Sequence, residues 1–259
     1  MTEPTRQPLS PRPGAGRRFS GQRTVRLGDV RPDGRLRLDA LARYAQDVSN
    51  DDTSDVDLPD DLAWVVRRTT VDVLVPAVLG EELEIVTFCS GLGRRWAERR
   101  LEVFGDCGGR YEVATLWIHI DVASGRPRTL SDRFLEIYGE AAGRKVSVRL
   151  AHGVAPVDAG RRVWPLRRVD FDVFNHVNNA AYWATVEELL PTWPGDWSAG
   201  TRCTVEYREG VSPGDEVVVA EVVSDQMVEL WWLTAAKQAA ASARLIPLEQ
   251  QWYRGDRSD

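Results

Sequence analysis

A dense cluster of polar residues lies in the string VDFDVFNHVNNAAYW at residues 169–183. Ten consecutive residues carry six hydrogen-bonding side chains, Asp170, Asp172, Asn175, His176, Asn178 and Asn179. A histidine four residues after an aspartate could act in general acid–base catalysis, with the carboxylate orienting the imidazole or a water molecule. Both precede a predicted helix, whose first N–H groups could hold a developing oxyanion. On the functional interpretation, the pattern serves chemistry that passes through an oxyanion.

The same residues also have a structural interpretation. Asn178 or Asn179 could cap the helix, while Asp172 and His176 could be solvated or hydrogen-bonded to backbone groups. Residue types alone do not separate the two interpretations.

Other common chemistries lack their motifs. The sequence has no G-x-S-x-G, no Gly-rich phosphate loop, no HExxH and only three histidines. Its three cysteines are too far apart for a CxxC zinc site or a disulfide framework, so we expect reduced thiols, no metal and no cofactor. A net charge of -6 argues against a protein-wide field for nucleic acid. No apolar run has the length of a membrane span, so we predict a cytoplasmic protein.

The elements before this cluster form a helix and then a sheet. Apolar residues at helical spacing predict a helix over 36–48, followed by a polar loop rich in aspartate at 51–61. Alternating apolar residues then predict four strands, at 64–75, 82–90, 95–104 and 111–121. The proline-rich residues 1–18 have almost nothing to bury, and we expect them to be disordered.

The second half repeats this order, with a helix at 178–190 and strands at 200–209, 215–224, 227–235 and 238–246. A shift of 134 places Thr70 on Thr204 and Gly80 on Gly214, and a shift of 138 places Tyr44 on Tyr182. The sequence thus predicts an α+β tandem (double) hotdog, in which each repeat is a long helix wrapped by an antiparallel sheet. We expect an N-terminal repeat over 19–145 and a C-terminal repeat with the site over 146–259.

Several blocks of this sequence resemble the acyl-acyl carrier protein thioesterases of plants and bacteria. They are WVVRRTTVDV at 64–73, GEELEIVT at 80–87, WIHIDVASGRPRTL at 117–130, D-F-D at 170–172, HVNN at 176–179 with Tyr182, and VEYRE at 205–209. The blocks keep the family's order over most of residues 20–246. This resemblance implies hydrolysis of the thioester between a fatty acyl chain and the phosphopantetheine arm of acyl carrier protein (ACP), a step of fatty acid biosynthesis and lipid metabolism.

The resemblance also implies catalytic residues. The family's Asp-x-Asn-x-His pattern falls on Asp172, Phe174 and His176, so a phenylalanine stands where the family has an asparagine and the polar relay is interrupted. The family's glutamate lies three residues after a tyrosine, where this chain has Gly210. Glu209 precedes it, and a one-residue bulge would bring Glu209 into the catalytic position.

We expect Phe174, Asn175, Val177, Asn178 and Asn179 to contact the substrate, with N–H groups near Val177 and Asn178 holding the oxyanion. On an extended segment Asn175 faces away from the site unless the loop bulges.

Further residues have a functional and a structural interpretation. Arginine pairs could dock an acidic carrier protein or form a solvated strand edge; they are Arg94–Arg95, Arg99–Arg100, Arg161–Arg162 and Arg167–Arg168. We expect His119 on the surface or at an interface, and His152 in a linker. Tryptophans in strands could line an acyl tunnel or pack in the core.

Three functions remain open. The first is the ACP thioesterase, and the second is a catalytically impaired hotdog that binds an acyl chain or acyl carrier, which Phe174 and the displaced glutamate motivate. The third is an acyl-coenzyme A thioesterase. The sequence also leaves the oligomeric state open, with a homodimer as one alternative.

Overall fold

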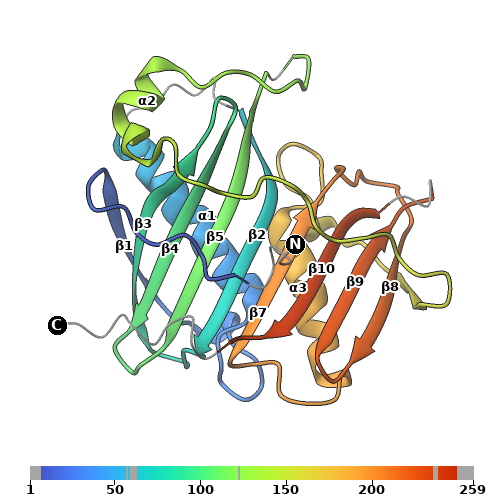
Figure 1. Ribbon diagram of the computed structural model, residues 1–259. Coiled ribbons are helices and arrows are strands. Elements are labelled where there is room, and N and C mark those ends of the chain that lie inside the picture. The colour runs from blue at the N-terminus through green and yellow to red at the C-terminus, as the bar shows by residue number, and fades with distance from the viewer. Residues whose placement is uncertain (1–6, 57, 59–62, 122, 236–238, 250–259) are drawn as a thin grey trace.

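The computed structural model describes residues 7–249 except 57, 59–62, 122 and 236–238. Its ten strands form one antiparallel sheet in the order β1-β3-β4-β5-β2-β7-β10-β9-β8-β6 (Figure 1). The first half contains β1 (Arg18–Thr24), α1 (Leu38–Asp55), β2 (Ala63–Val75), β3 (Glu82–Leu92), β4 (Trp96–Gly105), β5 (Arg110–Ile120) and α2 (Asp132–Tyr138). The second half contains β6 (Gly160–Trp164), α3 (Asn179–Leu189), β7 (Thr201–Tyr207), β8 (Val217–Ser224), β9 (Met227–Leu233) and β10 (Ala239–Pro247).

Each predicted helix and strand has a counterpart among the described residues, and the strand expected at Trp164 is β6. β1 and α2 were not predicted, because they have no strong apolar periodicity. The expected loop at 51–61 is wrong at its start, because α1 continues to Asp55. A carboxylate near a helix C-terminus is unfavourable, but Asp52 is held there by Arg99 and by the Tyr138 hydroxyl at 2.7 Å.

The two halves join where β2 pairs with β7. Thr70 lies opposite Thr204, its own equivalent at a shift of 134, and their hydroxyl oxygens are 3.2 Å apart. Asp72 lies opposite Arg202, and the two form a fully buried bidentate ion pair with both distances at 2.6 Å. A pseudo-two-fold axis therefore passes between the two threonines.

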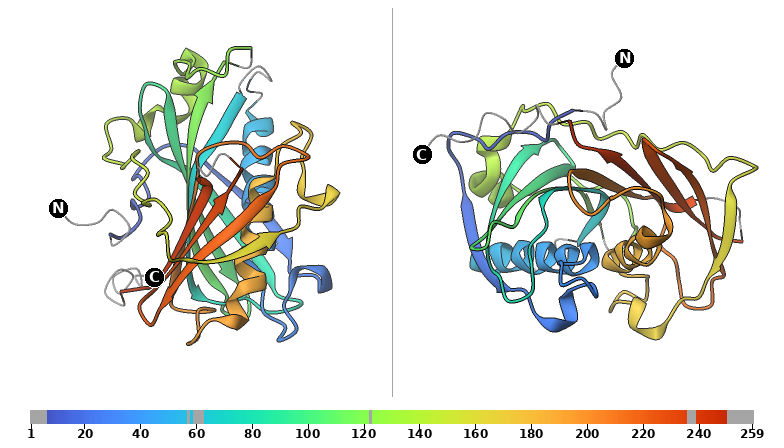
Figure 2. Two further views of the ribbon diagram at one scale, coloured as in Figure 1. Left: turned by 90° about the vertical axis from the view of Figure 1, so that its right-hand side faces the viewer. Right: turned by 90° about the horizontal axis from the view of Figure 1, so that it is seen from below.

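Both long helices pack on the inner face of the curved sheet (Figure 2, right). The core between them and the sheet contains Val71, Val73, Cys203 and Val205, which alternate with the polar residues of the junction. None of the helices among the described residues is long and apolar enough to span a bilayer.

The shift that places α1 on α3 differs from the predicted shift. Leu38 and Asn179 are the first residues of α1 and α3, which corresponds to a shift of 141 rather than 138. Tyr44 is therefore equivalent to Thr185, and not to Tyr182. The shift changes from 141 to 134 because the segment between helix and strand is seven residues shorter in the second half.

Two segments of the chain, the N-terminal segment and the linker between the halves, cross the outer face of the sheet (Figure 1). Residues 7–17, which we expected to be disordered, cross this face because sheet arginines bind their carbonyl groups: Arg100 binds Ser10 and Arg202 binds Gln7. The expectation of a free Arg99–Arg100 pair is also wrong, since both side chains are buried, Arg100 against Glu112.

His119 is buried, and its predicted surface position is wrong. It is 1% exposed, its Nδ1 lies 3.1 Å from the Thr129 carbonyl oxygen, and its ring packs against Trp64. Alternation along β5 indicated which residues share a face, but both faces of this strand are covered.

The linker between the halves places His152 against the outer face. Its Nδ1 is 3.0 Å from Ser242 Oγ, and burial, together with Arg244, lowers its pKa from 6.5 to about 3. These effects outweigh Glu206, whose Oε2 lies 3.9 Å from Nδ1. The folded protein therefore holds His152 neutral.

We predict an acid-sensitive stability that depends on this histidine. Between pH 6.5 and 3 the unfolded chain binds a proton that the folded protein does not, so stability falls as the pH falls. From pH 7 to pH 5 the loss from His152 should be about 2 kcal/mol. Urea denaturation at both pH values should show a smaller loss for His152→Asn, which retains a side-chain hydrogen-bonding group. Equal losses in both proteins would contradict this assignment.

Candidate active site

The polar cluster folds as a tight hairpin immediately before α3. The Asp172 N–H donates to the His176 carbonyl at 2.9 Å, and the Asn175 N–H donates to the Asp172 carbonyl at 3.0 Å. Asn175 has φ 62°, in the left-handed region that asparagine tolerates better than most residues. This is the three-residue hairpin loop with a bulge at its last position.

Several of the predicted site residues hold this hairpin together. Asp172 Oδ1 accepts the Phe174 N–H at 2.9 Å, as a turn-forming aspartate does. Asn178 Oδ1 accepts the Ala180 N–H at 2.9 Å and caps α3. The structural interpretation thus accounts for Asn175 and Asn178, and for one oxygen of Asp172.

His176 is exposed, and its ring lies over Gly210. A Cβ atom built on Gly210 would be 3.0–3.1 Å from three atoms of the imidazole ring. Position 210 is therefore in direct contact with His176, although glycine offers it no carboxylate. Glu209 is exposed beside it, and its N–H donates to the Ala240 carbonyl. The hydrogen bonds and ion pairs of the described residues include none that joins the side chains of Asp172, His176 and Glu209.

The prediction that the N–H groups of Val177 and Asn178 hold the oxyanion is wrong. The Val177 N–H donates to the Val211 carbonyl at 2.8 Å, and the Asn178 N–H donates to the Asp170 carbonyl at 2.7 Å, so both are occupied. The next N–H, that of Asn179, is the first of α3 and has no acceptor within the helix. Asn179 is half-buried and is the better donor for an oxygen of a ligand.

The first half contains a twin of this hairpin before α1. Its N–H donors and carbonyl acceptors are paired in the same way: Arg31 to Arg35, Gly34 to Arg31, Leu36 to Ala77 and Arg37 to Asp29, all at 2.8–2.9 Å. Gly34, with φ 83°, takes the place of Asn175. Arg31 and Arg35 thus stand where the second hairpin has Asp172 and His176.

The twin hairpin is closed by an ion pair from α3. Arg31 donates to both carboxylate oxygens of Glu187, at 2.6 and 2.9 Å. Glu187 Oε1 also accepts the Leu38 N–H, the first of α1, at 2.5 Å. The start of α1 therefore binds an anion that belongs to the protein itself.

An apolar pocket lies behind the second hairpin, with about 270 Å³ of space that is partly open to solvent. Its walls include Trp164, Val177, Tyr182 and Trp232, with Asp170 at one side and Thr185 on α3. In the first half the equivalent of Thr185 is Tyr44, whose hydroxyl reaches Asp29 Oδ2 at 2.7 Å. The smaller threonine leaves space where the first half has a tyrosine side chain.

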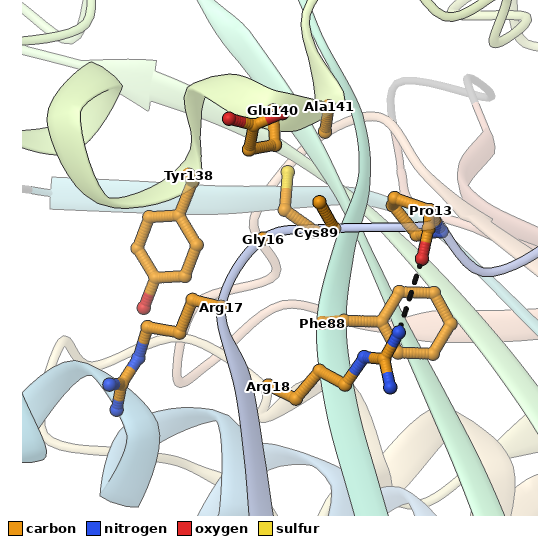
Figure 3. A pocket seen from close by; sticks show the side chains of 10 residues that line it. Pro13, Gly16, Arg17, Arg18, Phe88, Cys89, Tyr138, Glu140 and Ala141 are labelled. Atoms are coloured by element: carbon orange, nitrogen blue, oxygen red, sulfur yellow. Dashed lines mark hydrogen bonds between the residues drawn. The ribbon is translucent and has the colours of Figure 1, made fainter.

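A second pocket lies in the first half, with about 240 Å³ of space that is partly open to solvent (Figure 3). Its lining includes the N-terminal segment, Phe88, Cys89, the last residue of α2 and residues 140–141. Arg17 at its edge is bound to Asp52 at 2.7 Å. Burial raises the pKa of the Cys89 thiol to about 11, which makes it a poor nucleophile. We assign no catalytic role to this pocket.

Two helix-wrapped sheets fused through β2 and β7 define a double-hotdog protein. Models of the acyl-ACP thioesterase N-terminal and C-terminal domains match residues 16–138 and 157–245, so the chain belongs to the acyl-ACP thioesterase family. As a member of this family it is a thioester hydrolase.

Two solved structures of similar fold are a 12:0-ACP thioesterase from Umbellularia californica and an acyl-ACP thioesterase from Bacteroides thetaiotaomicron VPI-5482. They share 22% and 17% identity with this chain, and each has a TM-score of 0.73. The matches cover 88% of this chain and 96% and 97% of theirs. An uncharacterized protein of Mycobacterium tuberculosis strain H37Rv is 29% identical over 236 residues, which is 90% of this chain and 94% of that protein.

We predict that Asn175 acts through its backbone conformation. Asn175→Gly should keep both stability and turnover, because glycine adopts positive φ without strain. Asn175→Ala should lose about 1 kcal/mol of stability. Thermal melts and thioester turnover of both variants check this. If Asn175→Gly is stable but loses turnover, the asparagine amide itself contacts the substrate.

Proposed function

We propose that this protein hydrolyses fatty acyl-ACP at the hairpin before α3, with His176 and Asp172 as its catalytic pair. The observation that carries the proposal is that both family domains match in order, over residues 16–138 and 157–245. The exposed His176 and the open start of α3 support the choice of this hairpin over its twin, which the Arg31–Glu187 ion pair closes.

In the proposed mechanism His176 takes a proton from water, and the water oxygen attacks the thioester carbonyl carbon. The Asn179 N–H binds the carbonyl oxygen as it becomes an oxyanion. The C–S bond then breaks, and the thiol of the carrier arm leaves with a proton returned by His176. Asp172 holds the hairpin, and its second carboxylate oxygen can orient the imidazole or the water. The products are a fatty acid and the free carrier thiol.

Two departures from the family pattern make slow turnover the expectation. Phe174 replaces the asparagine and is 78% exposed at the hairpin tip, where its ring can touch an acyl or pantetheine chain. Gly210 replaces the glutamate at the position in contact with His176. These departures also favour the second candidate function, a hotdog that binds acyl groups without hydrolysing them.

We predict that Gly210→Glu increases turnover. Gly210 does not have a left-handed φ, so a side chain fits its backbone, although the imidazole must move by a few tenths of an ångström. A carboxylate beside His176 would stabilise the imidazolium formed during the reaction. Because positioned acid–base groups contribute roughly 10²–10⁴-fold, kcat should rise at least about tenfold. Free thiol release from acyl-ACP measures it.

Gly210→Gln is the matched control, because it adds the same bulk without the charge. Phe174→Asn should also raise kcat with little change in KM, and His176→Ala should abolish turnover in every background. If the wild type and the folded Gly210→Glu and Phe174→Asn proteins all bind acyl-ACP without releasing thiol, the thioesterase proposal fails. The protein would then be an acyl-binding hotdog.

Arg167 and Arg168, which precede the hairpin, differ in whether their side chains can bind the carrier protein. Arg167 is bound to Asp170 through its backbone N–H at 2.7 Å and its Nη2 at 2.8 Å, so it supports the fold. Arg168 is exposed, with no side-chain hydrogen bond or ion pair described. We propose that Arg168 contributes to docking the acidic carrier.

Arg168→Ala should therefore lower kcat/KM for acyl-ACP several-fold at low ionic strength, and less in high salt. It should leave short acyl-pantetheine substrates unaffected, because they lack the acidic protein. Arg133→Ala, on α2 in the other half, serves as the control. Steady-state kinetics at two salt concentrations test the prediction, and an equal loss on both substrates would place Arg168 in the site itself.

An acyl-coenzyme A panel measured alongside would decide between carriers. A homodimer and a cytoplasmic location stay predictions.

A further inference from the structure

The pseudo-two-fold axis gives each helix start a partner residue on the other helix. At the start of α1 this partner is Glu187, the ninth residue of α3, whose carboxylate binds the Leu38 N–H. The ninth residue of α1 is Gln46. The symmetry that relates Leu38 to Asn179 therefore brings Gln46 to the start of α3.

We propose that Gln46 is a catalytic residue that donates its side-chain N–H to the thioester carbonyl oxygen. Together with the Asn179 N–H it forms a two-donor oxyanion site, to which each half of the chain contributes one group. This inference rests on the proposed function. It assigns a role to a residue of the first half, outside the second-half hairpin to which the family pattern leads.

The twin hairpin, which the Arg31–Glu187 ion pair closes, shows what a carboxylate does at the ninth position of the facing helix. Glu187 occupies the helix start with its own negative charge and is neutralised by Arg31. At the open hairpin both residues differ, because Asp172 replaces Arg31 and Gln46 replaces Glu187. A neutral amide provides an N–H donor and leaves the place of the anion to the substrate oxygen.

The environment of Gln46 fits this role. Its side chain is half-buried, and no hydrogen-bond partner is found for it in the part of the chain that the structure describes. Asp172 and Asn179, its expected neighbours by symmetry, are also half-buried. A glutamate at position 46 would lie near the carboxylate of Asp172 and would have no arginine to neutralise it. At the twin hairpin, by contrast, Glu187 is neutralised by Arg31.

Two substitutions that preserve shape test the proposal in the full-length protein. Gln46→Met removes the donor and should lower kcat for acyl-ACP by about 10²-fold or more with little change in KM. Gln46→Glu should have a kcat as low as that of Gln46→Met at pH 8, where the carboxylate takes the place of the oxyanion. Its activity relative to wild type should rise at least about tenfold at pH 5, because a protonated carboxyl group can donate. A residue with a merely structural role would not give this pH dependence.

Asp47→Asn is the control, since Asp47 is the exposed neighbour on α1, and thermal melts verify that each variant folds. If the wild type releases thiol and either folded Gln46 variant retains the wild-type kcat at both pH values, the role of Gln46 is overturned while the proposed function stands. If the wild type itself releases no thiol, the proposed function fails, and this role fails with it.

Discussion

The pairing of β2 with β7 is the constraint on which the rest of the molecule depends. Thr70 and Thr204, equivalent residues of the two halves, meet on the pseudo-two-fold axis. Beside them Asp72 and Arg202 form a buried bidentate pair, and removing one member of such a pair typically costs about 3–5 kcal/mol. A slip of one residue would separate these partners and turn the apolar side chains away from the helices. The junction therefore fixes how the two halves of the sheet align, and with them the placement of α1 against α3.

The linker breaks this symmetry on the outer face. The axis relates the Asp72–Arg202 pair to Glu206 and Arg68, which lie opposite one another in the same ladder. Instead of binding each other closely, these two residues hold the linker. Arg68 donates to the Ser147 and Arg149 carbonyls, and Glu206 accepts the Ala151 and His152 N–H groups. One pair thus joins the halves, while its equivalent anchors the segment that connects them.

Much of this fold could be predicted from the sequence, because strands with one apolar face alternate clearly and the shift of 134 aligned the residues that meet on the axis. The helix alignment at 138 was wrong because it matched Tyr44 with Tyr182, whereas the first residues of α1 and α3 are 141 apart. His119 was misplaced because alternation does not reveal that α2 and the segment before it cover the second face.

The site was predicted less completely. The predicted residues do lie together in one hairpin, but residue types did not reveal the backbone hydrogen bonds that hold it. Val177 and Asn178 looked like free donors until their carbonyl partners Val211 and Asp170 were seen. The contact between position 210 and His176 could not be predicted from the sequence either, because glycine carries no side chain. The twin hairpin was overlooked because Arg31 and Arg35 have neither the charge nor the chemistry of Asp172 and His176.

The Arg31–Glu187 ion pair has a consequence for stoichiometry. A symmetric pair of hotdogs presents two identical helix starts, and each could process a substrate. Here one of them is permanently occupied by a side chain of the same polypeptide. On the proposed mechanism each chain therefore offers one open helix start to an acyl group, and cooperativity between two sites within a chain is not expected.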